Sequence, residues 1–152
     1  MKAVIQRVKH ASVTVEDKII GEIKQGFLVL LGVAKGDGEA EMIQLAKKIS
    51  EIRIFTDEND KMNLSINDIG GDILVVSQFT LCADTSHGRR PSFSKSAPAA
   101  LACELYEKFN AQLDELITGK IQTGEFGADM QVDLLNDGPV TIIMDTNEWK
   151  KG

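Results

Sequence analysis

Cysteine is scarce in this sequence, and the scarcity excludes two ways of stabilising a small protein. Only Cys82 and Cys103 occur among the 152 residues. They form neither a CxxC pair nor the spacing of a structural zinc site, so we expect neither a disulfide framework nor bound zinc. Two free thiols in a reducing compartment are the simpler interpretation, and a chain of this length can bury a sufficient core without cross-links.

Histidine is equally scarce, with only His10 and His87. A Ser-His-Asp triad would need one of the two, and neither has an evident partner. The P-loop, the GxGxxG fingerprint, the HExxH motif and the GxSxG elbow are absent as well. No His, Cys or carboxylate group has the spacing of metal ligands, so we expect no metal and no organic cofactor. A hydrolase built from this chain would lack a protein general base of the familiar kind.

Long apolar runs are also missing. The longest, residues 27–34, is far shorter than the roughly 20 residues that cross a bilayer. No long apolar segment follows Met1, which predicts a cytoplasmic protein without a signal peptide and outside the membrane. The formal net charge of -6 argues against non-specific coating of nucleic acid, because such binding rests on many Lys and Arg contacts. It leaves open a protein that grips only one end of an RNA.

The sequence does contain many short strand patterns and two long helical ones. Apolar side chains recur at helical spacing from Met42 to Ile52. A second helix is predicted from an N-cap at Ser96, with Pro98 in its first turn, to Leu116. Alternating or continuous apolar stretches predict strands at residues 2–9, 11–15, 18–23, 27–33, 53–55, 72–79, 130–135 and 140–145.

The arrangement of these elements predicts the fold class. The run 27–33 is rich in Val and Leu, which indicates a strand buried on both faces. Residues 57–71 are polar and turn-rich, which predicts a loop with one short helical turn. No repeat or linker divides the chain, so we expect a single domain over residues 1–152. Strands outnumber helices and come in consecutive groups, which favours the α+β class, with mixed or antiparallel, curled, barrel-like sheets flanked by two main helices.

Three hydrogen-bonding side chains, those of Ser77, Gln78 and Thr80, lie where the predicted strand 72–79 leaves the core. Strand ends are common places for reactive groups and exposed backbone N–H donors. The alternative is that these are ordinary strand residues and that Phe79 belongs to the core.

Residues 136–141 also allow two interpretations. Asp137-Gly138 is a strong turn signal and Pro139 can begin an edge strand, which predicts a simple hairpin. Alternatively, a cis bond between Gly138 and Pro139 would hold two carbonyl oxygens in a fixed direction. The residues alone do not decide between these interpretations.

Residues 77–81 and 136–141 match the two signature motifs of the D-aminoacyl-tRNA deacylase family, which this chain resembles from end to end. Further similar segments are residues 3–8, 11–13, 30–33, 53–55, 61–63, 90–93, 124 and 126–130. The resemblance implies an enzyme that hydrolyses the ester bond of D-aminoacyl-tRNA and rejects L-aminoacyl-tRNA. It also implies a homodimer with active sites at the subunit interface, each taking the 3' end of an aminoacyl-tRNA.

The resemblance also assigns the catalytic residues, which would be Ser77, Gln78, Phe79 and Thr80. Hydrolysis passes through an oxyanion, and backbone N–H groups around Phe79 and Thr80 are its natural donors. The Thr80 hydroxyl is a weak nucleophile without a neighbouring base, so we expect it to position rather than attack. In the family the 2'-OH of the terminal ribose is thought to assist the attack.

Chiral rejection would depend on a second group of residues. By the resemblance, Gly138-Pro139 would be cis and inserted into the partner's site, with Arg7 fixing the dipeptide in place. Phe126 and Met130 would border the same pocket. Two carbonyl oxygens near the substrate Cα would exclude an L side chain, and glycyl-tRNA, which has no side chain, would be hydrolysed to some extent.

A basic loop follows the first motif. Residues 84–95 contain Arg89, Arg90 and Lys95 against one acid, Asp84. These three cations are candidates for contacts with acceptor-stem phosphates, although a merely solvated loop fits the charge pattern equally well. Two rival functions stay open as well: a non-catalytic module that binds an RNA end or a D-amino acid, and a hydrolase of other small esters or amides that uses Thr80 covalently.

Overall fold

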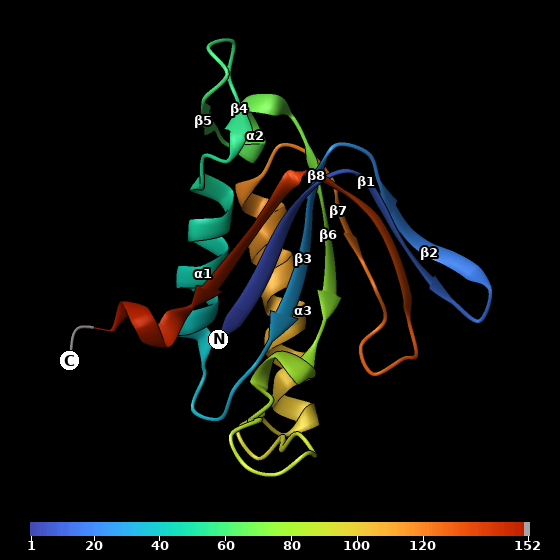
Figure 1. Cartoon of the computed structure of the whole chain (residues 1–152), viewed down its shortest axis with the longest axis vertical. Helices are drawn as coiled ribbons and strands as arrows, with labels where there is room; N and C mark the ends of the chain where they lie inside the picture. The colour runs from blue at the N-terminus through green and yellow to red at the C-terminus, as the bar shows by residue number, and fades with distance from the viewer. Residues whose placement is uncertain (151–152) are drawn as a thin grey trace.

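Six strands form the main sheet of this computed structural model, which describes residues 1–150 (Figure 1). They are β1 (Lys2–Val15), β2 (Lys18–Ile23), β3 (Gly26–Gly32), β6 (Asp72–Ser77), β7 (Ile121–Thr123) and β8 (Gln131–Asp145). Their order is β2-β1-β3-β6-β7, and β8 pairs with β1. The pairs of β1 with β2, β3 and β8 are antiparallel, whereas β3–β6 and β6–β7 are parallel, so the sheet is mixed.

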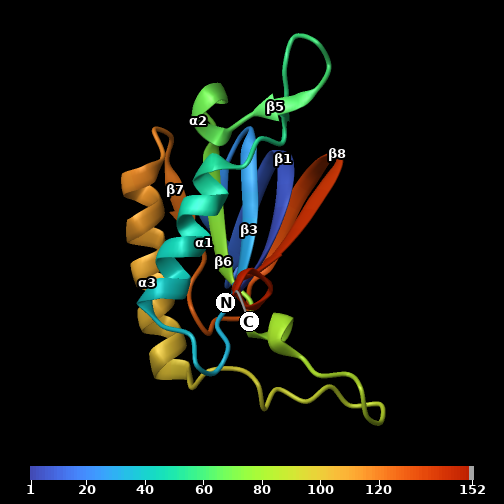
Figure 2. The ribbon, with the colours of Figure 1, turned by 90° about the vertical axis from the view of Figure 1, so that its left-hand side faces the viewer.

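The sheet curls until its ends approach each other. A Cβ built on Gly21 of β2 would lie 2.9 Å from the carbonyl oxygen of Thr123 in β7. Two long helices, α1 (Glu39–Glu51) and α3 (Ala99–Leu116), cover one side of the sheet, with β8 on the side away from them (Figure 2). The remaining elements are β4 (Phe55–Thr56), β5 (Met62–Leu64), the short helix α2 (Ile66–Ile69) and the 3-10 turns η1 (Phe79–Cys82) and η2 (Thr146–Trp149). The predicted α+β class, with a curled mixed sheet and two main helices, is confirmed.

Strand β3 contributes to hydrophobic clusters on both faces of the sheet. Phe27, Val29 and Leu31 face the large cluster under the helices, where they pack with residues such as Leu45 and Phe109. Leu28 faces the smaller cluster inside the curl. The prediction that this strand is buried on both faces is therefore confirmed, and its side chains hold the two layers together.

The predicted hairpin at residues 136–139 is wrong, because β8 continues through this segment as one strand along β1. The Asn136 side-chain amide donates to the carbonyl oxygens of Arg7 and Val140, both at 3.0 Å. The ladder shifts register near this point, between Gln6 and Val8 and again before Ala11. The irregularity is thus absorbed as a bulge, and the local turn signal gives way to bonds with a distant strand.

The start of α3 also differs from the prediction. Ser96 is not an N-cap: the helix begins at Ala99 with Pro98 at its N-cap. Ser96 instead forms a bridge with Ala34, and the Ala97 amide donates to the Val33 carbonyl at 3.0 Å. The chain stays extended up to Pro98 because it pairs with the segment that follows β3.

Four further elements differ from the predicted ones. The strand predicted at 53–55 is displaced to Phe55–Thr56 and pairs only with β5. The loop 57–71 contains β5 as well as the expected short helix, α2. The strand predicted at 72–79 ends at Ser77, and residues 121–123, left out of the prediction, form β7. In the described part of the chain, no helix has both the length and the apolarity to cross a bilayer.

The close approach of β3 to β6 predicts that Gly26 cannot be replaced by a larger residue without loss of stability. A Cβ on Gly26 would overlap the carbonyl oxygen of Asp72, its partner on β6. Because both strands are packed on two faces and cannot separate, Gly26→Ala should lower the free energy of unfolding by roughly 3 kcal/mol. Gly38→Ala is the matched control, since its Cβ would meet only the Glu41 carboxylate at 3.7 Å, and it should cost less than about 1 kcal/mol. Urea denaturation measures the free energy of unfolding of both variants. An equal decrease in Gly26→Ala and Gly38→Ala would contradict the close approach at Gly26.

Candidate active site

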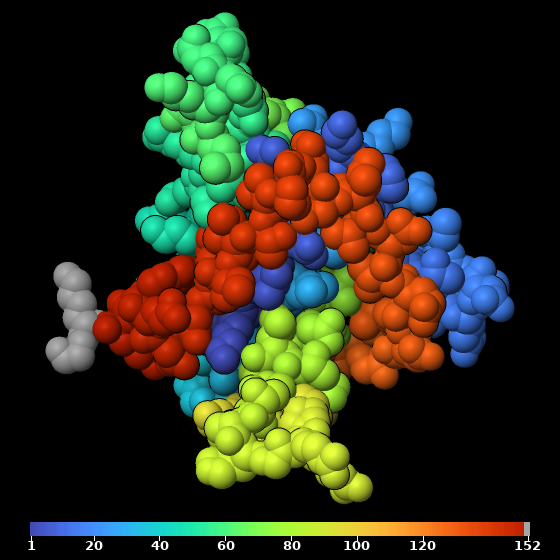
Figure 3. All heavy atoms as spheres, viewed as in Figure 1, coloured from blue at the N-terminus to red at the C-terminus, as the bar shows by residue number. Residues whose placement is uncertain are grey.

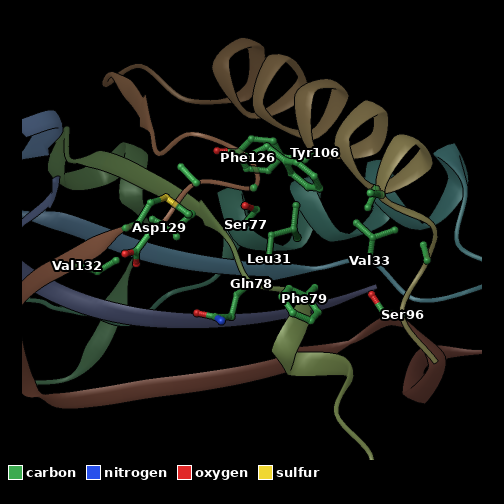
Figure 4. A pocket seen from close by; sticks show the side chains of 17 residues that line it. Leu31, Val33, Ser77, Gln78, Phe79, Ser96, Tyr106, Phe126, Asp129 and Val132 are labelled. Carbon is green, nitrogen blue, oxygen red and sulfur yellow. The ribbon is translucent and has the colours of Figure 1, made fainter. Parts of the chain in front are cut away.

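A cavity of about 500 Å³ lies between the ends of β3 and β6 and the first turns of α3 (Figure 4). Its wall is mostly apolar or aromatic, with a few polar side chains that converge on it. The lining residues are Leu31, Val33, Val76, Ser77, Gln78, Phe79, Ser96, Ala97, Ala99, Ala102, Tyr106, Phe126, Gly127, Ala128, Asp129, Met130 and Val132. An apolar pocket with a few placed polar groups is the usual form of a small-ligand site.

The segment that ends β6 forms one edge of this cavity. The strand stops at Ser77. The backbone N–H of Gln78 then donates to the Leu31 carbonyl at 2.7 Å, and this bond holds the turn η1 against β3. Ser77, Gln78 and Phe79 line the cavity; Thr80 does not, but its hydroxyl accepts a hydrogen bond from the Gln78 side-chain amide. Phe79 is 56% exposed and packs edge-on against Phe93. The interpretation of Phe79 as a core residue is therefore wrong.

The backbone amides of Phe79 and Thr80 donate no hydrogen bond within the described residues. They open a 3-10 turn, where the first N–H groups have no partner inside the turn. Within residues 1–150, neither amide has an acceptor in hydrogen-bonding geometry. Two adjacent donors at the edge of a largely apolar cavity are the arrangement that stabilises a developing oxyanion.

The opposite wall comes from α3 and from the segment between β7 and β8. The Tyr106 hydroxyl donates to the Val75 carbonyl at 3.2 Å, and burial raises the pKa of this phenol. Its ring lies 5.8 Å from that of Phe126. A Cβ on Gly124 would come within 2.6 Å of the Met130 sulfur, so the backbone passes close under that side chain. The predicted border residues Phe126 and Met130 both line the cavity.

A second group of predicted residues lies elsewhere, around the buried side chain of Arg7. Arg7, only 9% exposed, donates from Nη1 to the Ile54 carbonyl at 2.8 Å and from Nε to the Asp137 carbonyl at 3.1 Å. The peptide bond between Gly138 and Pro139 is cis. A Cβ on Gly138 would lie 2.9 Å from Arg7 Nη2. Arg7, on β1, thus ties the bulged part of β8 at Asp137 to the segment before β4 at Ile54.

This cluster and the cavity are separate within one chain. Gly138 and Pro139 are exposed and are not among the residues that line the cavity. The bend of β8 and the turn after β6 lie toward opposite ends of the sheet (Figure 1). A dipeptide placed in this way could reach a cavity of the same kind only on another molecule.

The basic loop is held at its base and projects from the body (Figure 2). Asp84 and Ser92 form a bridge across it. Hydrogen bonds from Ser86, and then the charge of Lys95, lower the pKa of the Asp84 carboxyl. Arg89 and Arg90 are exposed and do not line the cavity, whereas the Lys95 ammonium group lies 3.5 Å from the Asp84 carboxylate.

Residues 4–145 match the sequence model of the family described as D-Tyr-tRNA(Tyr) deacylase. The chain belongs to this family. Among similar members, the D-aminoacyl-tRNA deacylase of Thermosipho africanus (strain TCF52B) is 56% identical over 97% of the chain and 99% of the relative. The D-aminoacyl-tRNA deacylase of Pseudoalteromonas translucida (strain TAC 125) is 60% identical over 93% of the chain and 97% of the relative.

Two solved structures extend the comparison. The structure titled c-Myc DNA Unwinding Element Binding Protein has a TM-score of 0.91 and 42% identity, covering 95% of this chain and 98% of that one. A probable eukaryotic D-amino acid tRNA deacylase has a TM-score of 0.78, covering 94% and 97%, but at 16% identity this likeness shows the fold alone.

The site of this deacylase-family chain includes residues that the sequence did not single out. Tyr106 and Ser96 line the cavity together with the motif residues. Tyr106 is the chain's only tyrosine and lies in a predicted amphipathic helix, which was the one available signal. Among residues 1–150, no group of three or more His, Cys, Asp or Glu side chains is placed to hold a metal ion.

The bonds of Arg7 predict that even lysine cannot replace it. An ammonium group cannot reach the acceptors that Nε and Nη1 serve in different directions, and a buried carbonyl would lose its donor. Arg7→Lys should therefore lower the free energy of unfolding by about 2 kcal/mol. Arg53→Lys is the control, because Arg53 is exposed and only contacts Asn63 at 3.4 Å; it should change stability by less than about 0.5 kcal/mol. Chemical denaturation compares the stabilities of the two variants. An Arg7→Lys protein as stable as the wild type would show that the Arg7 hydrogen bonds do not stabilise the bulge.

Proposed function

We propose that this chain hydrolyses the ester bond between a D-amino acid and the 3' end of tRNA and so removes mischarged D-aminoacyl-tRNA from translation. The observation that carries the proposal is the pair of free amides at Phe79 and Thr80 beside an apolar cavity, in a chain of the deacylase family. Relatives that are 56% and 60% identical bear the name D-aminoacyl-tRNA deacylase. Because translation takes place in the cytoplasm, we place the enzyme there.

In the proposed reaction a water oxygen adds to the ester carbonyl. The negative charge that develops on the carbonyl oxygen is stabilised by the amides of Phe79 and Thr80, which cost little reorganisation because η1 is held against β3. Collapse of the tetrahedral intermediate breaks the bond to the ribose oxygen. The products are the free D-amino acid and tRNA with a free 3' end.

Thr80 acts in this scheme by position and not as a nucleophile. Its hydroxyl accepts a hydrogen bond from Gln78, and neither histidine lines the cavity; His87 contacts Ser86 in the basic loop. Asp129 lines the cavity but lies on the side away from Phe79 (Figure 4). With no base beside Thr80, the 2'-OH of the terminal ribose is the group that assists the attack, as the family resemblance implies.

The cavity suits the terminal nucleoside of the tRNA. The rings of Tyr106 and Phe126 offer aromatic surface, and bases stack on such rings without needing a sequence code. The amino acid then lies outward, beside Phe79, near the surface where a second subunit would supply Gly138-Pro139. There the carbonyl oxygens of the dipeptide exclude an L side chain, and the absence of a Cβ on Gly138 allows their close approach.

This scheme predicts a marked stereochemical preference with little preference among side chains. D-tyrosyl-tRNA should be hydrolysed with a kcat/KM at least about 100-fold above that of L-tyrosyl-tRNA, because the L side chain meets the carbonyl oxygens. D-aspartyl-tRNA should fall within about tenfold of D-tyrosyl-tRNA, since the D side chain is not gripped. Glycyl-tRNA should also be hydrolysed. Release of radiolabelled amino acid measures all four rates.

Other results of this assay would support the rival functions. Binding of D-aminoacyl-tRNA without release of the amino acid would identify a binding module. An acyl adduct on Thr80, detected by mass spectrometry after rapid quenching, would identify a covalent esterase. A difference of many orders of magnitude between D-tyrosine and D-aspartate would contradict rejection by backbone carbonyls.

A homodimer completes the proposed site. Ile143 and Leu135 on β8 are 74% and 48% exposed, and Phe79 and Phe93 beside the cavity are exposed as well. Large apolar side chains left exposed are candidates for an interaction surface. In a two-fold dimer each subunit would give its Gly138-Pro139 to the partner and receive the partner's in return.

The dimer is testable at its most exposed apolar side chain. Ile143→Glu should raise the dimer dissociation constant at least about 100-fold, because a carboxylate would be buried without a partner. Hydrolysis of D-tyrosyl-tRNA at low protein concentration should fall with it. Ile43→Glu is the matched control, since Ile43 is 46% exposed on α1, away from β8. Sedimentation velocity reads the oligomeric state, and an Ile143→Glu protein that stays dimeric and active would exclude this interface.

A further inference from the structure

A second pocket, of about 410 Å³, lies next to the cavity and is unlike it in character. Three lysines, Lys2, Lys35 and Lys95, line it, and we refer to it as the lysine pocket. It lies where the start of β1 meets the end of β8 and the segment before α3; Figure 3 shows these parts of the chain in blue, red and yellow-green side by side.

The lysine pocket shares a wall with the cavity. Val33 lines the cavity, whereas Ala34 and Lys35, the next two residues, line the lysine pocket. Likewise Ser96 lines the cavity and Lys95 the lysine pocket. The wall is a pair of short extended segments joined by the Ala34–Ser96 bridge. Only this pair of extended segments therefore separates a ligand in the cavity from the lysine pocket.

The lysines carry more charge than their surroundings neutralise. Across residues 1–150, neither Lys2 nor Lys35 has a carboxylate within 4.0 Å, and only Lys95 does, at 3.5 Å from Asp84. Asp145 also lines the pocket and keeps its negative charge while its carboxylate accepts from the Asn147 backbone amide at 3.0 Å, so it offsets one of the three lysine charges.

Two other groups near the lysine pocket add no free negative charge. Asp37 is ion-paired with the Met1 ammonium group at 2.8 Å. The Cys82 thiol lines the pocket, and burial raises its pKa, which keeps it neutral. The pocket is thus a local positive site in a chain of net charge -6.

The backbone holds two of these lysines in place. Lys2 lies in β1 between Gly32 of β3 and Asp145 of β8. The Lys35 amide donates to the Lys95 carbonyl at 2.9 Å, which joins the two sides of the wall. The side chains of these lysines therefore extend from a fixed backbone. Arg89 and Arg90, in contrast, lie on a loop that projects from the body (Figure 2).

We propose that the lysine pocket binds phosphodiester groups of the RNA strand that enters the cavity, next to its terminal nucleoside. This inference rests on the proposed function. A strand whose last nucleoside fills the cavity must carry its preceding phosphates over the cavity's edge, and the wall beside Lys35 and Lys95 is such an edge. Lysine ammonium groups bind phosphates as compact point charges. Lys2 and Lys35 thereby become substrate-binding residues in addition to Lys95.

The experiment compares two esters that differ only in their phosphates. D-tyrosyl-tRNA carries the full strand, whereas D-tyrosyl-adenosine ends at the nucleoside and has none. For the Lys2→Gln/Lys35→Gln double variant, the KM for the tRNA ester should rise about 10-fold, and the ratio of kcat/KM for tRNA ester over nucleoside ester should fall by a similar factor. The salt dependence, as the slope of log KM against log salt concentration, should weaken by about 1.4. Lys18→Gln is the matched control, because Lys18 is exposed on the β1–β2 hairpin and lines neither pocket.

Four outcomes overturn the proposal. One is an unchanged KM for the tRNA ester. Another is an equal loss on both esters, which would indicate a role in the fold or the chemistry. A third is an equal loss in Lys18→Gln, which would indicate a general charge effect. The last is inhibition of the wild-type protein by inorganic phosphate with a constant below about 1 mM, which would indicate a free-anion site.

Failure of the proposed function would give a different result. In that case the wild-type protein hydrolyses neither ester. The affinity for uncharged tRNA, measured by fluorescence anisotropy, then tests the lysine pocket independently of hydrolysis. The Lys2→Gln/Lys35→Gln variant should bind tRNA about 10-fold more weakly than Lys18→Gln. Equal affinities would exclude the lysine pocket as an RNA contact whatever the chemistry of the site. Thermal unfolding of each variant confirms that the fold is intact.

Discussion

The carboxyl end of β3 is the constraint on which the site depends. Leu31 accepts from the Gln78 amide, and two residues later Val33 accepts from the Ala97 amide. The first bond sets the turn that presents the amides of Phe79 and Thr80, and the second keeps the chain extended before α3. Both bonds exist because β3 is buried between β1 and β6 in a fixed register. Any slip of that ladder would move the oxyanion donors, the cavity wall and the lysine pocket together.

Sequence patterns predicted those parts of the fold in which local and distant interactions agree. The run 27–33 is apolar on every side, and burial on two faces is the only packing that suits it. Residues 136–139 are the opposite case. A strong local turn signal gives way to a strand because the Arg7 side chain, on β1, bonds to the carbonyls of Asp137 and Ile54, and the Asn136 side chain bonds back to the Arg7 carbonyl. Partners more than a hundred residues away carry no local signal, so the pattern could not reveal them.

The same distinction applies to the site. A strand end with polar side chains is visible in the sequence at 77–80, and the structure ends β6 there at Ser77, with Ser77, Gln78 and Phe79 beside the cavity. Its exposure was not visible: Phe79 could be a core residue until the structure placed it beside Phe93. Counting charges along the chain singled out Arg89, Arg90 and Lys95 and could not add residues that are distant in sequence. Arg89 and Arg90 are neighbours in sequence, whereas Lys2 and Lys35 are brought to Lys95 only by the ladder and the bridge.

A net charge of -6 on a chain proposed to bind RNA is a physical conflict that the placement of the lysines resolves. The overall field repels a polyanion, which weakens binding to internal stretches of RNA. In the proposed scheme the lysine pocket acts only within about 8 Å, the screening length at physiological salt, and it therefore favours a strand that ends in the cavity and brings its phosphates there. The proposed chemistry uses neutral amides, so it needs no charge of its own. Under this proposal, selection of an RNA end by lysines and cleavage of the ester by amides are separable, and the D-amino acid can vary without disturbing either.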